Sequence, residues 1–518
     1  MTDKVIVVVG AGASCVSYVE ALLAEVPTCK PGLRFTIYII ERRRRFGRGL
    51  AYEQDLDSNI LNTKASFITP FSNRPGHFHD WALANRDAWE EEFPGYRLEP
   101  DSYVPRPLFG LYLEAMVDEL VRDAIALGCH VIPVHAEATS IKYGHDGRLI
   151  VSTDSSLAFQ ADHVVLSCGN LPSLEHKSLA GTPNFFSSPY PVRKLPKKIA
   201  PDAVVGILGA HLSAIDAIVG LTSRGHAGQI GAHSRSGFLP FVRGTQGRYQ
   251  PRTLTRAMVE DYVREKGTIR LRTFASWVID EMRAAGEDVS AIDWQAPMPP
   301  RDPEAFYERE ISAARRPRLW QAVLYSTNAI VDLVWHHLDV TDRREFWNYR
   351  SAWMAHRVSI PVENAERLLR LLKTGQLAFL TGHTRVSPTS GGIEISVEGR
   401  TGSATYAYAA VIAATGAPLD ARMVDSSLVQ SLIACGMARP HPYGGLEIDA
   451  ESGFLRNRSG QPDSRLTVIG DLTSGTYFFT SALEINARQA GESARQTVRR
   501  TREGDGPLRE ESAIERLA

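Results

Sequence analysis

Short apolar runs that end at a glycine recur along this chain. The first, Val5 to Val9, leads into Gly10, and a helical pattern continues to about Glu25. A second apolar run, Phe35 to Ile40, is closed by Glu41. Strand, glycine turn, helix and strand in this order predict a βαβ unit with a parallel sheet.

The same pattern returns in the middle of the chain. Ala203 to Leu208 has the composition of a buried strand, Gly209 begins a turn, and Leu212 to Arg224 has a helical pattern. The next apolar run, Gln229 to His233, completes a second βαβ unit. We therefore expect an α/β fold with two Rossmann-like dinucleotide-binding domains.

The remaining pattern predicts how these units are connected. Residues 253–374 are helical in pattern and carry six tryptophans, whereas short apolar runs at 409–413 and 466–469 predict further strands. A helix is expected at about 481–500. The first dinucleotide-binding domain is predicted at 1–180 and 419–502, and the second at 195–250 and 376–418. A helical insertion at 251–375 is a possible substrate lid, and 503–518 form a polar tail.

Composition narrows the class of protein. The 518 residues correspond to roughly three to four domains. The 58 basic and 59 acidic residues balance, which argues against a nucleic-acid binder. No apolar run approaches a membrane span or a signal-peptide core, and the five scattered cysteines form no CxxC pair. We expect a cytoplasmic protein that uses no metal and binds no membrane. Whether the protein forms a homo-oligomer is left open by the sequence.

The first glycine turn has the composition of a pyrophosphate site. Gly10 permits the turn, and Gly12 allows the backbone to approach a pyrophosphate at the N-terminus of the helix, beside Ala13 and Ser14. Cys15 stands where a third small residue is usual. Glu41, at the end of the next strand, is placed to bind ribose hydroxyls.

The second turn, Gly209 to Asp216, departs from this pattern. His211 occupies the middle glycine position, so that the phosphate either lies farther out or accepts a hydrogen bond from the imidazole. Ser234 and Arg235 follow the next strand in place of an acid. An arginine at this position suits a 2′-phosphate and predicts NADPH, the alternative being a surface arginine on a degenerate repeat.

The motifs together resemble the FAD- and NADPH-dependent flavoproteins of the class B monooxygenase type, in particular an FAD-NAD(P)-binding family that includes N-oxygenases similar to nitrosuccinate synthases. The resemblance is carried by GAGAS at Gly10, FGRGLAY at Phe46, LNT at Leu61, VPR at Val104, GAHLSAID at Gly209, SRSGFLP at Ser234, ATG at Ala414 and IGD at Ile469. It implies that Asn62 and Lys64 face the flavin. The further cofactor-binding residues that it implies are Arg48, Gly49, Thr63, Gly169, Ser213, Thr415, Gly416, Gly470 and Asp471.

The function implied by this resemblance is oxygenation of the amine nitrogen of a small amine or amino acid, aspartate-like substrates included, through a C4a-hydroperoxyflavin. The alternatives are an NADPH oxidase or an electron-transfer reductase with a protein partner, and a non-catalytic nucleotide-binding protein. Arg243 and Arg357 are candidate clamps for a substrate carboxylate.

Three other features have a structural and a functional interpretation. The His77–Asp80 segment is expected to be a loop with partly buried histidines rather than a metal site. Arg42 to Arg45 is expected to be a solvated turn, with contact to FAD phosphates or a partner as the alternative. The tryptophan-rich helices either form a core or cover the substrate.

Overall fold

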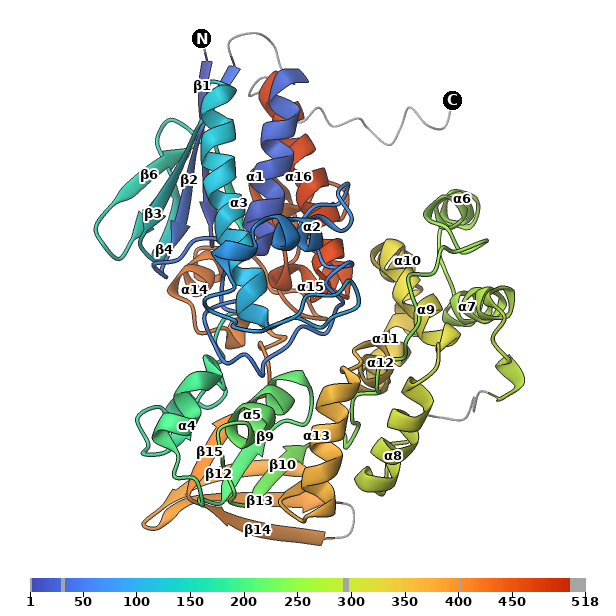
Figure 1. The fold of residues 1–518 in the computed structure, drawn as a ribbon. Helices are drawn as coiled ribbons and strands as arrows, with labels where there is room; N and C mark the ends of the chain where they lie inside the picture. Colours follow the sequence, from blue (N-terminus) through green and yellow to red (C-terminus); the bar gives the residue numbers. More distant parts are fainter. Residues whose placement is uncertain (1, 29–32, 292–297, 400–401, 504–518) are drawn as a thin grey trace.

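The computed structural model describes residues 2–28, 33–291, 298–399 and 402–503. Figure 1 shows two α/β units, one around β1 and α1 and one around β9 and α5, with a group of helices to one side of them. Cys29 and residues 504–518 of the expected polar tail lie outside the described residues. The expected α/β fold with two Rossmann-like units and a helical insertion is confirmed.

The first sheet has the order β16-β17-β7-β1-β2-β3. All neighbours are parallel except β16 and β17. Its strands are β1 (Thr2–Val9), β2 (Leu33–Glu41), β3 (His130–His135), β7 (His163–Leu166), β16 (Phe454–Arg456) and β17 (Pro462–Val468). The two ends of the chain therefore meet in one sheet, because β17 pairs with β7 beside β1.

Helices on one face of this sheet bury its apolar side chains in a continuous core. They are α1 (Ala13–Glu25), α3 (Arg106–Ala126) and α16 (Leu483–Glu503), with α2 (His77–Ala84) against α3. The other face packs against the small antiparallel sheet β4 (Ala138–Tyr143), β5 (Leu149–Thr153) and β6 (Ala158–Ala161), and against α14 (Ser427–Ala434).

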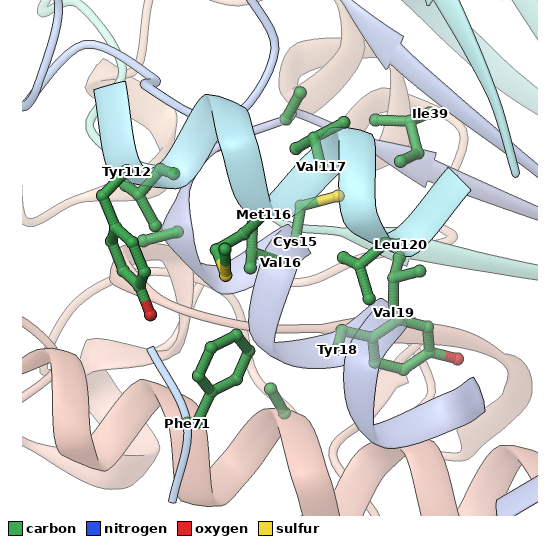
Figure 2. Close-up of a cluster of buried hydrophobic side chains, with 14 of the residues drawn as sticks. Cys15, Val16, Tyr18, Val19, Ile39, Phe71, Tyr112, Met116, Val117 and Leu120 are labelled. Carbon is green, nitrogen blue, oxygen red and sulfur yellow. The ribbon is translucent and has the colours of Figure 1, made fainter. Parts of the chain in front are cut away.

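Cys15, at the third small-residue position of the first turn, is part of this core. Figure 2 shows its side chain between α1 and α3, near Val117 and with Ile39 of β2 behind it. The side chain is 1% exposed, and burial raises the pKa of its thiol. The cysteine therefore packs between helix and sheet as a small apolar residue and does not face the predicted phosphate site.

The second sheet is parallel throughout, in the order β11-β10-β9-β15-β8. Its strands are β8 (Phe185–Phe186), β9 (Val205–Leu208), β10 (Ile230–Ser234), β11 (Leu377–Thr381) and β15 (Ala410–Ala413), covered by α4 (Leu195–Lys198), α5 (Leu212–Thr222) and α13 (Val362–Lys373). A three-stranded antiparallel sheet, β12 (His383–Thr389), β13 (Gly392–Gly399) and β14 (Gly402–Tyr408), precedes β15. Only β13 of these three has an apolar run that the sequence pattern predicts, because β12 and β14 are mostly exposed.

The helical insertion has its own core, which includes residues near the C-terminus. Its helices are α6 (Arg256–Lys266), α7 (Leu271–Ala285), α8 (Pro303–Ala314), α9 (Leu319–Ser326), α10 (Val331–His337), α11 (Val340–Asn348) and α12 (Arg350–Arg357). Trp335 donates its indole N–H to the carbonyl of Gly475 at 2.8 Å and packs on Phe478. The insertion is thereby docked on the segment around α15 (Ser474–Tyr477), which follows the first sheet.

None of the helices in the described ranges is long and apolar enough to span a membrane.

Candidate functional site

The first glycine turn lies where β1 meets α1. Gly10 has a φ of +95°, and a side chain there would lie 2.5 Å from the carbonyl oxygen of Ser167. Gly12 caps α1, and a Cβ there would meet only Gly49, at 3.7 Å. No side chain caps this helix N-terminus. Gly10 is thus required by the fold, whereas Gly12 faces an open approach to helix N–H groups, as an anionic ligand needs.

The Phe46–Gly49 segment forms the second wall of this turn. The N–H of Gly47 donates to the carbonyl of Ala11 at 2.7 Å. The buried Arg48 donates from Nη2 to Glu114 at 2.7 Å, while its Nε and Nη1 find no hydrogen-bond partner among the described residues. Two unsatisfied guanidinium nitrogens beside an open helix N-terminus fit a diphosphate ligand such as that of FAD.

Glu41 and the Gly470–Asp471 pair complete this region. Glu41 accepts a hydrogen bond from the N–H of Ala11 at 3.0 Å, so that its carboxylate supports the turn directly. A Cβ on Gly470 would lie 3.6 Å from Oγ of Ser14, which brings the end of β17 to the same turn. Burial raises the pKa of Asp471 to about 6, against the effect of Arg350 on α12.

The second turn has nearly the same backbone as the first. Gly209 has a φ of +124°, and a side chain there would lie 2.5 Å from the carbonyl oxygen of Ala414. His211 caps α5 with φ and ψ of −101° and −161°, against −87° and −169° for Gly12. The histidine therefore occupies the turn without strain. Burial and the charge of Arg350 lower its pKa, so its imidazole is neutral near pH 7.

The other predicted nucleotide-binding residues lie at the carboxyl ends of strands. Ser234 ends β10, and its Oγ accepts from the N–H of Gly237 at 3.0 Å; Arg235 beside it is exposed and has no ion pair among the described residues. Thr415 and Gly416 follow β15, and Gly169 follows β7. This is the edge at which ligands of parallel α/β sheets bind.

The segment with Asn62, Thr63 and Lys64 lies between the two sheets. Asn62 and Thr63 are partly buried, and Lys64 is 5% exposed. The Lys64 ammonium pairs with Asp101 at 3.2 Å and lies 3.5 Å from the carbonyl oxygen of Thr245. Lys64 is therefore at the contact between the first α/β unit and the loop that leads into the helical insertion.

Arg243 and Arg357, which are 114 residues apart, are brought together by backbone pairing. The N–H of Arg243 donates to the carbonyl of Ile360 at 2.9 Å, and Nε of Arg243 donates to Oγ of Ser359 at 3.1 Å. The guanidinium groups of Arg243 and Arg357 lie 4.3 Å and 4.9 Å from the ring centroid of Tyr325.

Neither guanidinium has a carboxylate within ion-pair distance among the described residues. Arg357 is 5% exposed and donates to Oδ1 of Asn328 and to the carbonyl oxygen of Tyr325. Burial lowers its pKa to about 10. The charge of Glu484 acts favourably on Arg357 from beyond ion-pair distance. A buried cation with no carboxylate at ion-pair distance is costly, and a carboxylate ligand would supply a direct partner.

Tyr103 is a mostly buried phenol near Arg243 and Asp101. Burial raises the pKa of this phenol, and the charges of Arg243 and Asp101 both act on it. Lys64 is connected to this region through Asp101 and through the carbonyl of Thr245, two residues after Arg243.

Sequence reasoning did not single out Asp101, Tyr103, Tyr325 or Ser359. Aromatic and hydroxyl residues in helical or loop segments give no periodic signal, and only the pairing of two distant segments gives them a common place. Asp216, the acid of the GAHLSAID motif, was considered only as part of that motif. A carboxylate in a helix as apolar as α5 indicates a buried partner, and this signal could have identified Asp216.

The histidine segment at residues 77–80 and the arginine run at residues 42–45, each of which had two interpretations, contact nearby polar or acidic side chains. The His77–Asp80 segment is the first turn of the helix α2, so the expected loop is wrong. His77 is hydrogen-bonded to Tyr112 at 2.8 Å, and His79 lies beside Asp80. In the Arg42–Arg45 run, all but Arg44 pair with glutamates.

Comparison with known proteins agrees with the sequence motifs. A family model described as FAD-NAD(P)-binding matches residues 7–171, which confirms the resemblance over the first α/β unit. The nitrosuccinic acid synthase npaA of Aspergillus oryzae is 29% identical over 185 residues. The match spans 33% of this chain and 27% of the length of that relative.

Solved structures share the fold over almost the entire chain. The L-lysine 6-monooxygenase of Pseudomonas syringae is similar with a TM-score of 0.58 and 16% identity, covering 96% of this chain and 99% of that one. The ornithine N-hydroxylase KtzI of Kutzneria sp. 744 gives a TM-score of 0.56 and 16% identity, covering 96% and 100%. These likenesses show the architecture, two α/β units with an added helical part.

Proposed function

We propose that this protein is an FAD- and NADPH-dependent monooxygenase that oxygenates the amine nitrogen of a small dicarboxylic amino acid of the aspartate type. The observation that carries the substrate is the pair of guanidinium groups of Arg243 and Arg357 at Tyr325, which have no carboxylate at ion-pair distance among the described residues. Lys64 contacts the carbonyl of Thr245, two residues after Arg243. The cofactors are supported by the open Gly12 turn, the unsatisfied nitrogens of Arg48 and the match to an FAD-NAD(P)-binding model.

The names of two similar proteins support an aspartate-type substrate in one case and the two cofactors in the other. The relative from Aspergillus oryzae is a nitrosuccinic acid synthase, and the structure of the Kutzneria enzyme is described with reduced FAD, NADP+ and L-ornithine. In this proposal the first α/β unit, with Glu41, Ser14 and Asp471, holds FAD. The second unit holds NADPH, with Arg235 near the 2′-phosphate and His211 and Ser213 at the pyrophosphate.

FAD and NADPH, when bound, would supply the two electrons that activate O2, and O2 is the source of the oxygen atom that is transferred. The chain itself has to bind the substrate, remove its proton and exclude water. Arg243 and Arg357 bind the two carboxylates, and the fork of each guanidinium fixes the orientation of a carboxylate. Aromatic side chains where the insertion docks on the segment around α15, Trp335 and Phe478 among them, exclude water.

The same cations favour the reactive form of the substrate. An ammonium has no lone pair, so the amine must lose its proton before it can accept oxygen. Arg243, Arg357 and Lys64 place three positive charges around the substrate, and like charges lower the pKa of an ammonium. Asp101, 3.2 Å from Lys64 and mostly exposed, is positioned to pass that proton to solvent.

The test is NADPH oxidation by the purified protein with a panel of amino acids, with hydroxylamine and peroxide measured in parallel. We expect aspartate to give substrate-dependent hydroxylamine with little peroxide, and asparagine, ornithine and lysine to give much less. Preference for ornithine or lysine would overturn the dicarboxylate proposal. Peroxide alone with every amine would favour an oxidase, or a reductase that lacks its partner. A cytoplasmic location and self-association are untested predictions that belong to this proposal.

A further inference from the structure

A buried carboxylate on α5 joins three segments of the chain. Asp216 is 4% exposed. It accepts from Nη1 of Arg106 at 2.7 Å and from Nη2 at 3.3 Å, which makes a two-point ion pair. It also accepts from the hydroxyl of Tyr190 at 2.6 Å. Arg106 begins α3 in the first α/β unit, Asp216 belongs to the second, and Tyr190 lies on the connection between them.

Arg106 is bonded just as closely to the segment that carries Lys64. Its backbone N–H donates to the carbonyl of Asn59 at 2.9 Å, and its Nε donates to the carbonyl of Ile60 at 3.2 Å. One arginine therefore holds the backbone two residues before Asn62 with its Nε and the middle of α5 with its terminal nitrogens.

Neighbouring contacts bring the same two elements together. The carboxylate of Asp55 accepts from the N–H groups of Val192 and Arg193, both at 2.7 Å. Oγ of Ser223 at the end of α5 donates to Oγ of Ser58 at 3.1 Å. A side chain on Gly220 would lie 2.2 Å from Cγ1 of Val192, so a glycine is needed for this close approach. The interface is thus continuous from residue 55 to residue 60.

The cluster of Arg106, Asp216 and Tyr190 lies between the predicted NADPH turn and the segment that carries Lys64. Asp216 is one helical turn after Ser213, and the N-terminus of α5 carries His211 at the predicted NADPH turn. The hydroxyl oxygen of Tyr190, whose proton goes to Asp216, accepts a longer hydrogen bond from Oγ of Ser213 at 3.4 Å. A shift of α5 relative to the Asn62–Lys64 segment would have to break a buried ion pair, and a charge left alone in that place is costly.

We propose that Arg106, Asp216 and Tyr190 form a lock that holds the nicotinamide-binding unit in one position against the flavin-binding unit. They are positioning residues, because their contacts are with the elements that hold the cofactors. The proposal rests on the proposed function for its catalytic consequence, but the lock itself is a property of the chain.

The experiment uses the full-length protein with Asp216→Asn, which keeps the shape and removes the charge. Asp342→Asn is the matched control, since Asp342 is also a buried carboxylate, 2.7 Å from Arg270, but lies within the helical insertion. Hydrogen–deuterium exchange of residues 55–62 and 212–222 is measured without added cofactor. The lock predicts faster exchange in both segments for Asp216→Asn and unchanged exchange there for Asp342→Asn.

The second measurement distinguishes an effect on the rate of flavin reduction from an effect on the binding of FAD and NADPH. With NADPH in excess, the rate of flavin reduction in Asp216→Asn should fall about tenfold or more, because small misplacements of reacting groups are costly. FAD content and the Kd for NADPH should change less than about twofold. Tyr190→Phe should give a smaller loss, and Arg106→Lys, which keeps the charge, should retain more of the rate than Arg106→Met.

The two measurements test the lock and the proposed function separately. Unchanged exchange in Asp216→Asn, or unchanged flavin reduction beside it, would overturn the lock. If the wild-type protein does not reduce flavin with NADPH, the proposed function fails, while the exchange measurement still decides whether the two units are held together by Asp216. If Asp216→Asn does not fold, Tyr190→Phe and Arg106→Lys carry the test.

Discussion

Arg243 and Arg357 lie over the same aromatic ring, 4.3 Å and 4.9 Å from the centroid of Tyr325, although they come from different elements. Two cations in such proximity repel each other, and in the described residues no carboxylate pairs with either. An arrangement of this kind is expected where a ligand supplies the negative charge.

The first prediction concerns substrate binding at this pair. Arg243→Gln should raise the KM for a dicarboxylic amino acid roughly tenfold to hundredfold, because a charge-assisted hydrogen bond contributes about 1.5–3 kcal/mol. Steady-state kinetics with aspartate and with its monocarboxylic analogue measure this, and the analogue should lose less. Arg283→Gln, an exposed arginine on α7 paired with Asp280, is the control. Equal effects from both variants would remove Arg243 from the substrate site.

The second prediction separates the two glycines of the first turn. Gly12→Ala should weaken FAD retention at least about tenfold, while the apoprotein keeps its stability within about 1 kcal/mol, because the new Cβ points to open space. Gly10→Ala should instead destabilise the apoprotein by more than about 1 kcal/mol, since the φ of +95° disfavours a side chain. Flavin absorbance after gel filtration and urea unfolding measure the two effects. Retained FAD in Gly12→Ala would contradict the assignment.

A third prediction concerns the choice between NADPH and NADH. Arg235 is exposed at the end of β10 and has no ion pair among the described residues, so its charge is available to a 2′-phosphate. Arg235→Gln should reduce the preference for NADPH about tenfold or more, measured as the ratio of kcat/KM values, with FAD content unchanged. Arg224, an exposed arginine after α5, provides the control Arg224→Gln. An unaltered ratio in Arg235→Gln would make Arg235 a surface residue.

The fourth prediction is a pH dependence of stability. His163 on β7 is 3% exposed and is hydrogen-bonded to Thr467 at 2.9 Å and to Thr497 at 3.2 Å. Burial lowers its pKa to about 3, against about 6.5 in an unfolded chain. The folded state therefore keeps the neutral form, and its contribution to stability is complete above pH 6.5 and is lost as the pH falls toward 3.

The measurement compares urea unfolding of the wild type and His163→Gln at pH 7.5 and pH 5. The variant should be less stable at pH 7.5, and the difference in free energy of unfolding should narrow by about 2 kcal/mol at pH 5. His145→Gln, at an exposed turn, should leave the profile unchanged. A constant difference at the two pH values would show that His163 does not titrate in this way.

The sequence determined the local parts of this protein. A buried strand, a glycine that must adopt positive φ and an apolar helix are written in neighbouring residues, so β1 with α1 and β9 with α5 could be predicted from Gly10 and Gly209. The strand β12 was not predicted, because a mostly exposed strand has little apolar pattern. The position of the Cys15 side chain could not be predicted from the sequence either, because this side chain packs between helix and sheet.

Only the tertiary structure decided which distant side chains meet. Arg243 was singled out as a clamp by its chemistry, but its place beside Arg357 depends on the pairing of two segments more than 100 residues apart. The ion pair of Arg106 with Asp216 depends likewise on how α3 and α5 pack. Periodicity along a chain gives the face of one helix or strand; the register between two elements follows from the packing of many side chains at once.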